Sequence, residues 1–123
     1  MLPNDTALFV GSSRPVRDIE AFVNALNGID VFSNRGLAGI DGNISTVFGV
    51  ASEYKSTTAI LGDLTLLHDI SSLANASKDN LRIFVIDNNG GGIFSTLPQA
   101  GVDNFDQLFG LSLIHISEPT RPY

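Results

Sequence analysis

Four short apolar segments, separated by stretches with helical periodicity, constrain the fold of this 123-residue chain more than any other feature. Each segment is typical of a buried strand. Because each is continuously apolar rather than alternating, together they indicate a parallel sheet with helices on both faces. We therefore expect an α/β fold with a doubly wound parallel sheet. The predicted strands are 7–10, 30–33, 58–61 and 81–86.

The intervals between these segments predict three helices. The first begins after a candidate N-cap at Ser13 and ends at Asn27 and Gly28, because its apolar residues recur at spacings of three and four and so share one face. Those residues are Val16, Ile19, Phe22, Val23 and Leu26. The second and third helices are predicted over 44–51 and 66–76.

Composition narrows the class of protein. With 7 Lys and Arg against 13 Asp and Glu, the net charge of −6 disfavours nucleic acid and anionic membranes as partners. There is no cysteine for a disulfide or a thiolate metal site. No apolar run approaches the roughly 20 residues of a membrane span, and no basic and then apolar leader follows Met1. We expect a single cytoplasmic domain that binds neither nucleic acid nor membrane.

Polar or glycine-rich residues follow every predicted strand, at the edge where open parallel sheets bind ligands. The sharpest pair is Gly62-Asp63 after the third strand and Asn88-Asn89 after the fourth. A carboxylate, an amide oxygen and a backbone carbonyl suit Mg²⁺, and Asp63, Asn88 and the Gly90 carbonyl could supply them. Taken singly, Asp63 could be a helix cap and the Asn-Gly cluster a turn.

At this spacing the pair resembles the diphosphate-magnesium motif of thiamine-diphosphate enzymes. Two residues depart from that motif. Leu64 stands where glycine is usual, and Asp87 stands where the first asparagine is usual, so Asn88 aligns with the ligand asparagine. The resemblance implies bound thiamine diphosphate with Mg²⁺ or Mn²⁺.

Two further segments make the resemblance more specific. The run 33–42, with sequence SNRGLAGIDG, and the run 89–95, with sequence NGGGIFS, resemble the 2-succinyl-5-enolpyruvyl-6-hydroxy-3-cyclohexene-1-carboxylate synthases. These are thiamine-dependent transferases of menaquinone biosynthesis. The resemblance extends from about Ala7 to Gly110 and implies that 1–110 is part of the C-terminal, cofactor-binding domain.

The family reaction decarboxylates 2-oxoglutarate and adds the succinyl carbanion equivalent to isochorismate. The resemblance implies a homo-oligomer with its active site at a subunit interface, where a glutamate from another domain activates the cofactor. Since the chain lacks that domain, we expect it to be inactive alone.

The resemblance also assigns site residues. Metal ligands are Asp63, Asn88 and Gly90, and cofactor-binding residues are Ile40, Gly62, Asp63, Leu64, Asn88 and Gly90, with Ile40 wedged between the two cofactor rings. Substrate-binding residues are Ser13, Arg17, Arg35, Ile93, Phe94 and Leu97. Arginine pairs well with substrate carboxylates. The plain alternatives are a solvated helix residue for Arg17 and core packing for the apolar three.

Two other functions stay open. Another thiamine-diphosphate enzyme, such as an acetolactate synthase or a 2-oxoacid decarboxylase, would share the metal motif but not the run 33–42. A non-catalytic nucleotide-binding module would share the fold class, although no G-x-G-x-x-G follows the first strand. We expect His68 to be a helix-surface residue without a role.

The last residues, 111–123, break the pattern. They resemble the conceptual translation of an adapter used in preparing DNA sequencing libraries, so we expect this tail to be non-native.

Overall fold

A four-stranded, all-parallel sheet in the order β2-β1-β3-β4 forms the centre of the computed structural model, which describes residues 5–75 and 79–105. The strands are β1 (Thr6–Val10), β2 (Asp30–Phe32), β3 (Ser56–Gly62) and β4 (Leu81–Ile86). The predicted tail, 111–123, lies outside the described residues.

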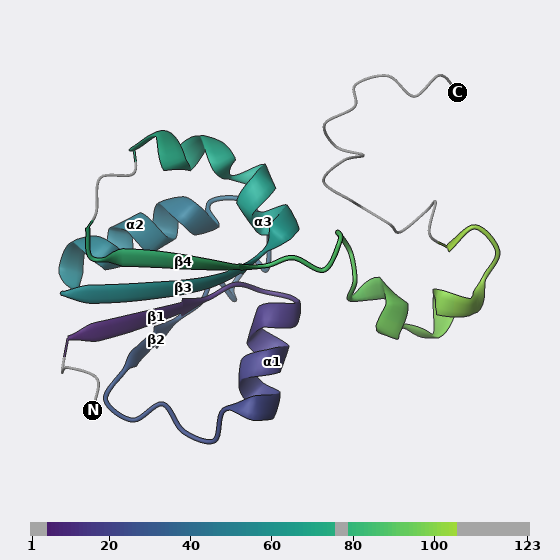
Figure 1. Ribbon diagram of the computed structural model, residues 1–123, viewed down its shortest axis with the longest axis horizontal. Helices are drawn as coiled ribbons and strands as arrows, with labels where there is room; N and C mark the ends of the chain where they lie inside the picture. The colour runs from purple at the N-terminus through teal and green to yellow at the C-terminus, as the bar shows by residue number, and fades with distance from the viewer. Residues whose placement is uncertain (1–4, 76–78, 106–123) are drawn as a thin grey trace.

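Helices cover both faces of this sheet. They are α1 (Arg14–Phe22), α2 (Asn43–Glu53) and α3 (Asp63–His68), followed by the 3₁₀ segments Ile70–Asn75, Phe94–Thr96 and Pro98–Gly101. Figure 1 shows α1 on one face and α2 and α3 on the other. The predicted doubly wound α/β class is therefore confirmed.

The parallel register aligns the carboxyl ends of the inner strands. Val10 pairs with Ile60, and Gly62 pairs with Ile86. The chain runs from β1 outward to β2 and then returns past β1 to β3, so its connections leave β1 and β3 in opposite directions. The carboxyl edge between these two strands is the switch point, where open α/β sheets bind ligands.

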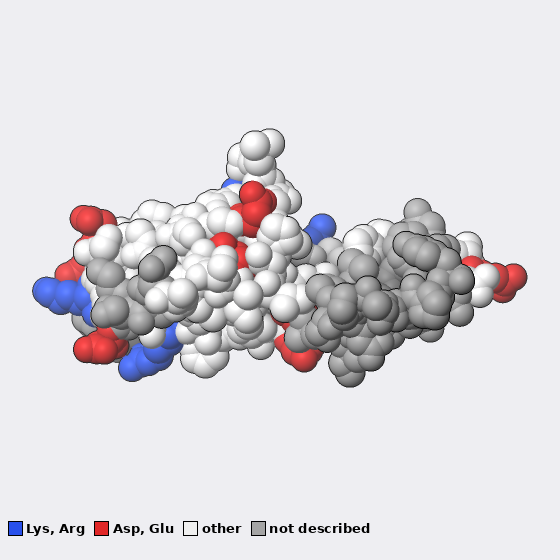
Figure 2. All heavy atoms as spheres, turned by 90° about the horizontal axis from the view of Figure 1, so that it is seen from above, with Lys and Arg blue, Asp and Glu red and all other residues white. Residues whose placement is uncertain are grey.

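The hydrophobic core lies between the sheet and α2. Phe9, Ile44, Val47, Ala59 and Leu61 form a cluster in which no residue is measurably exposed. On the surface that faces the viewer in Figure 2, acidic and basic side chains are interspersed and much of the area is uncharged. Within residues 5–75 and 79–105, no helix combines the length and apolarity that crossing a membrane requires.

Two predicted helices differ in extent. Helix α1 ends at Phe22 instead of reaching Leu26, because Phe22 is 81% exposed and so little packing supports further turns. Ser13 occupies the N-cap position with φ 73° but makes no side-chain cap hydrogen bond. The third helix begins at Asp63 rather than Leu66, and after Asp69 it continues as a 3₁₀ segment. His68, at its end, is exposed as expected.

Side chains from other segments hold both ends of α2. At its start, Asp69 Oδ2 accepts hydrogen bonds from the backbone N–H of Ile44 (2.7 Å) and Ser45 (3.3 Å), which the Gly42 N-cap cannot satisfy with a side chain. At its end, Asn80 Nδ2 donates to the carbonyls of Ala51 (2.8 Å) and Tyr54 (2.6 Å). The fold thus fixes α2 rigidly beside the switch point.

Candidate functional site

Asp63 joins the end of β3 to the loop that follows β4. It is the first residue of α3 and only 4% exposed. Its Oδ1 accepts a hydrogen bond from the Leu64 N–H (2.9 Å), and its Oδ2 accepts one from the Gly90 N–H (2.7 Å). Asp63 therefore orders the start of α3, as a capping residue does, but it also reaches across to a second strand end.

The loop after β4 is shaped by the side chains of its first residues. Asp87 Oδ1 accepts from the Asn89 N–H (2.8 Å), and Asn88 Oδ1 accepts from the Gly92 N–H (3.1 Å). Gly90 has φ 70°, which favours glycine. A Cβ at Gly92 would lie 2.9 Å from Asn88 Cγ, so only glycine lets the backbone approach this amide so closely. The Asn-Gly cluster is a turn, and the turn holds Asn88 beside α3.

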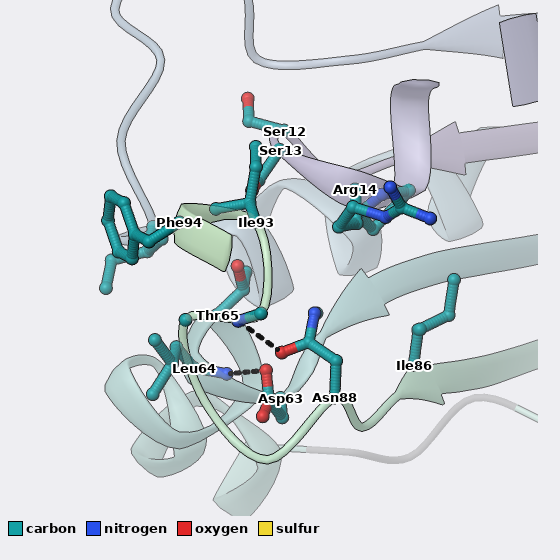
Figure 3. Close-up of a pocket in the computed structure, with 15 residues that line it drawn as sticks. Ser12, Ser13, Arg14, Asp63, Leu64, Thr65, Ile86, Asn88, Ile93 and Phe94 are labelled. Carbon is teal, nitrogen blue, oxygen red and sulfur yellow. Dashed lines mark hydrogen bonds between the residues drawn. The ribbon is translucent and has the colours of Figure 1, made fainter. Parts of the chain in front are cut away.

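A cavity of about 260 Å³ lies at the carboxyl ends of β1, β3 and β4 (Figure 3). Residues from three strand ends and from the segment 33–42 line it. Of the predicted site residues, the cavity is lined by Ser13, Ile40, Gly62, Asp63, Leu64, Asn88, Ile93 and Phe94. Gly90 is not among the lining residues, but it is buried and its N–H donates a hydrogen bond to Asp63.

Three predicted substrate residues do not line this cavity. Arg17 is exposed on α1 and donates to the Ser13 carbonyl (3.0 Å). Arg35 is exposed on the segment 33–42, and Leu97 is 43% exposed at the end of a 3₁₀ segment. The structure therefore brings the predicted metal and cofactor residues together more closely than the predicted substrate residues.

The cavity also includes residues that the sequence did not single out. They are Ser12, Arg14, Pro15, Thr65, Ile86, Gly91 and Gly92. Arg14 pairs with Asp18 at 3.0 Å, and its side chain points away from Asp63 in Figure 3. The Ser12 Oγ is buried without a hydrogen-bond partner among the described residues. Their signal in the sequence is that each lies within two positions of a strand end or of a predicted site residue, and Gly91 and Gly92 also belong to the run 89–95.

The chemistry of the donor set fits a hard divalent cation. Asp63 is a buried carboxylate, and no lysine, arginine or histidine in the described part of the chain forms an ion pair with it. A buried anion is costly unless a cation or hydrogen bonds compensate it, and here the N–H groups of Leu64 and Gly90 supply two hydrogen bonds but no positive charge. Residues 5–75 and 79–105 contain no cluster of three His, Asp or Glu side chains. A metal here would therefore be held by one carboxylate with neutral oxygens, such as that of Asn88, as Mg²⁺ accepts.

Comparison with known proteins finds similar curated proteins, although no family model matches. The chain is 47% identical over 116 residues to the 2-succinyl-5-enolpyruvyl-6-hydroxy-3-cyclohexene-1-carboxylate synthase of Leuconostoc mesenteroides, covering 91% of this chain and 21% of that protein. It is 43% identical over 117 residues to the synthase of the same name from Thermobifida fusca, covering 89% and 21%. With the synthase of Trichodesmium erythraeum the identity is 47% over 111 residues, covering 88% and 19%. The chain thus spans about a fifth of the length of these curated relatives.

Proposed function

We propose that the chain is part of a longer enzyme, called here the parent enzyme, which is a member of the family of the 2-succinyl-5-enolpyruvyl-6-hydroxy-3-cyclohexene-1-carboxylate synthases. Residues 1–110 would form part of its C-terminal domain, which binds thiamine diphosphate and Mg²⁺ or Mn²⁺. The observation that carries this proposal is the convergence of Asp63 and the 87–92 loop on one cavity at the switch point.

The proposed reaction is that of a transferase in menaquinone biosynthesis. The parent enzyme decarboxylates 2-oxoglutarate and adds the succinyl carbanion equivalent to isochorismate. Family membership favours this function over an acetolactate synthase, a decarboxylase or a nucleotide-binding module. When bound, thiamine diphosphate supplies the electron sink for the carbanion, so the protein contributes binding, orientation and electrostatics.

Asp63, Asn88 and the Gly90 carbonyl are the proposed metal ligands. The two hydrogen bonds to Asp63 come from different segments, one from α3 and one from the 87–92 loop, and each of its carboxylate oxygens accepts one of them. Such preorganisation lowers the cost of ordering the ligands on binding. Gly62 and Leu64 flank Asp63 at the cavity and are the proposed contacts to the diphosphate.

Ile40 and the loop after β4 supply the apolar side of the site. Ile40, Ile93 and Phe94 line the cavity from two segments far apart in sequence. Ile40 is proposed to pack against the cofactor rings, and Ile93 and Phe94 are proposed to exclude water from the substrate. Leu97 would extend that apolar side only after a rearrangement, since it lies outside the cavity lining here.

Ser13, Arg17 and Arg35 are the proposed contacts to the substrate carboxylates. Ser13 lines the cavity, whereas both arginines are exposed and are not among its lining residues. Arginine binds carboxylates bidentately, and both substrates are polyanions. The activating glutamate would come from another domain across a subunit interface, so this chain alone should be inactive. We also propose a cytoplasmic location, which the absence of cysteine supports.

The test is metal-dependent cofactor binding to the parent enzyme. Thiamine diphosphate binding, measured by calorimetry, should require Mg²⁺ or Mn²⁺ and disappear when EDTA is added. Asp63→Ala should lower the affinity on the order of 100-fold or more, because it removes the only charged metal ligand. Equal affinity with and without divalent cation would contradict the proposal.

A further inference from the structure

Asn43, the first residue of α2, hydrogen-bonds to both sides of Ile40. Its Nδ2 donates to the carbonyl of Gly39 (3.1 Å) and to the carbonyl of Asp41 (3.2 Å). These are the carbonyls that precede and follow Ile40 in the chain. A single amide group therefore fixes the backbone on each side of a residue that lines the cavity.

Burying an amide group at this position lowers stability, which indicates that the two hydrogen bonds are the role of the Asn43 side chain. Asn43 is only 1% exposed, and its Oδ1 is buried without a hydrogen-bond partner in the part of the chain that the structure describes. An unpartnered buried acceptor is destabilising, whereas an apolar residue would fill the same place without that cost. Among residues 5–75 and 79–105, the hydrogen bonds of this side chain that offset the cost are those with Gly39 and Asp41.

Asn34 Nδ2 donates to Thr46 Oγ1 (3.1 Å), and Thr46 Oγ1 donates to the Gly42 carbonyl (2.8 Å), so α2 also holds other parts of the segment 33–42, but neither hydrogen bond reaches residues 39–41. Residues 33–42 contain neither helix nor strand. Gly39 N–H donates to the Leu37 carbonyl (2.9 Å), but Leu37 itself is 93% exposed. Ile40 is 41% exposed while its side chain lines the cavity. Without the Asn43 amide, the backbone of 39–41 would lose its direct side-chain tie to the well-packed helix α2.

We infer that Asn43 is a positioning residue, which holds Ile40 against whatever occupies the cavity. The inference rests on the proposed function in one respect, since it takes that occupant to be the thiamine cofactor. Asn43 does not line the cavity, so it acts through Ile40 rather than by touching the ligand. It is the link by which the rigid start of α2 sets the position of a cavity residue in an irregular segment.

The chain provides a matched control at the other end of the same helix. The Asn80 amide also donates to two carbonyls, those of Ala51 and Tyr54, but these lie at the other end of α2 from the segment that carries Ile40, and Asn80 does not line the cavity. Asn43→Asp and Asn80→Asp each replace the donating amide by a carboxylate of the same size. Both should lower stability, and only the first should free the segment that carries Ile40.

The first readout does not depend on the cofactor. Limited chymotrypsin digestion of the folded parent enzyme should cut after Leu37 about tenfold faster in Asn43→Asp than in Asn80→Asp, because local opening governs native-state cleavage. Asn43→Ser serves as a second variant that removes the amide without adding charge. Equal cleavage after Leu37 in the Asn43 and Asn80 variants would overturn the inference.

The second readout tests whether the effect passes through Ile40. Asn43→Asp should lower kcat about tenfold in the unaltered parent enzyme but less than about twofold when Ile40→Ala is already present, since residues that act as a unit are non-additive. The same loss of kcat in both backgrounds would show that Asn43 is merely structural. Failure of metal-dependent cofactor binding would refute the proposed function instead, while the digestion result would still decide whether Asn43 holds the segment.

Discussion

Two carboxylates, Asp63 and Asp69, look alike in their hydrogen bonds and differ in their surroundings. Asp63 accepts backbone N–H groups from Leu64 and Gly90, and Asp69 accepts them from Ile44 and Ser45. Asp69 additionally accepts from the Ser72 hydroxyl (2.7 Å). Asp63 is buried and lines the cavity, whereas Asp69 is partly exposed and lies outside the cavity lining.

The difference shows that backbone hydrogen bonds do not by themselves identify a ligand-binding carboxylate. Asp69 satisfies orphan N–H groups at the start of α2, which is a stabilising role and needs no ligand. Asp63 is held from two sides beside an amide oxygen in an open cavity, and in the described residues no cationic side chain pairs with it. The cavity, rather than the count of hydrogen bonds, distinguishes them.

The largest expected effect separates these two carboxylates. Asp63→Asn in the parent enzyme should weaken thiamine diphosphate binding in Mg²⁺ on the order of 100-fold, since the amide lacks the charge that a hard cation prefers. Asp69→Asn should change that affinity less than about twofold, because Asp69 does not line the cavity. Calorimetric titration measures both. Similar losses of cofactor affinity in the two variants would contradict the proposed difference between Asp63, a metal ligand, and Asp69, a helix cap.

Arg35→Ala tests whether the segment 33–42 contributes a substrate contact to the proposed site. We expect kcat/KM for isochorismate to fall roughly 30-fold, through loss of a charge-assisted hydrogen bond, with cofactor affinity nearly unchanged. Steady-state kinetics with each substrate varied in turn gives the comparison. Arg82→Ala, which removes an exposed arginine from β4, is the matched control and should leave kcat/KM as it was. Unchanged kinetics in Arg35→Ala would remove Arg35 from the proposed site.

Asp69→Ala measures how much the Asp69 side chain contributes to stability at the start of α2. The start of α2 would lose its side-chain acceptor, so the free energy of unfolding should fall by about 1–2 kcal/mol, as for other lost helix caps. Urea unfolding of the parent enzyme checks this, provided the domain's transition is resolved. Ser72→Ala should cost less, because the Asp69 carboxylate keeps its bonds to Ile44 and Ser45. An unchanged unfolding midpoint in Asp69→Ala would mean that the Asp69 cap does not contribute to the free energy of unfolding.

The sequence predicted the sheet because apolar runs mark its strands, although only β1 is buried throughout and β2 and β4 contain exposed residues. Continuous apolar runs identified all four strands and their parallel class, and the spacing of Asp63 and Asn88 identified two neighbouring strand ends. It could not predict the end of α1, since the apolar periodicity continues through Leu26 while the packing that would support a longer helix is absent.

Hydrogen bonds from side chains to segments distant in the sequence also could not be predicted from the sequence. Asp69 caps a helix 24 to 25 positions earlier in the chain, and Asn80 holds the far end of the same helix. Such pairings depend on how the elements pack, which no local pattern encodes. The same holds for Asn43. Its position near the start of a predicted helix did not indicate that its side chain hydrogen-bonds to the residues on each side of Ile40.

The smallest expected effect concerns a third carboxylate, Asp30, whose partner is a side chain on the surface. Its Oδ2 accepts a hydrogen bond from the Tyr54 hydroxyl (2.8 Å), and this bond, with lesser contributions from desolvation and nearby charge, raises the pKa of Tyr54. Tyr54→Phe removes the bond but can keep the edge-to-face packing on Phe32, whose ring centroid lies 5.6 Å away.

A raised pKa in the folded state means that the contribution to stability is complete below the ordinary tyrosine pKa of 10.0 and is lost as the pH rises through the raised value. The melting temperature of Tyr54→Phe should therefore lie less than about 2 °C below that of the unaltered protein at pH 8, because exposed pairs stabilise weakly, and the gap should close above pH 10. A gap that widens with pH would show that Tyr54 acts through something other than its bond to Asp30.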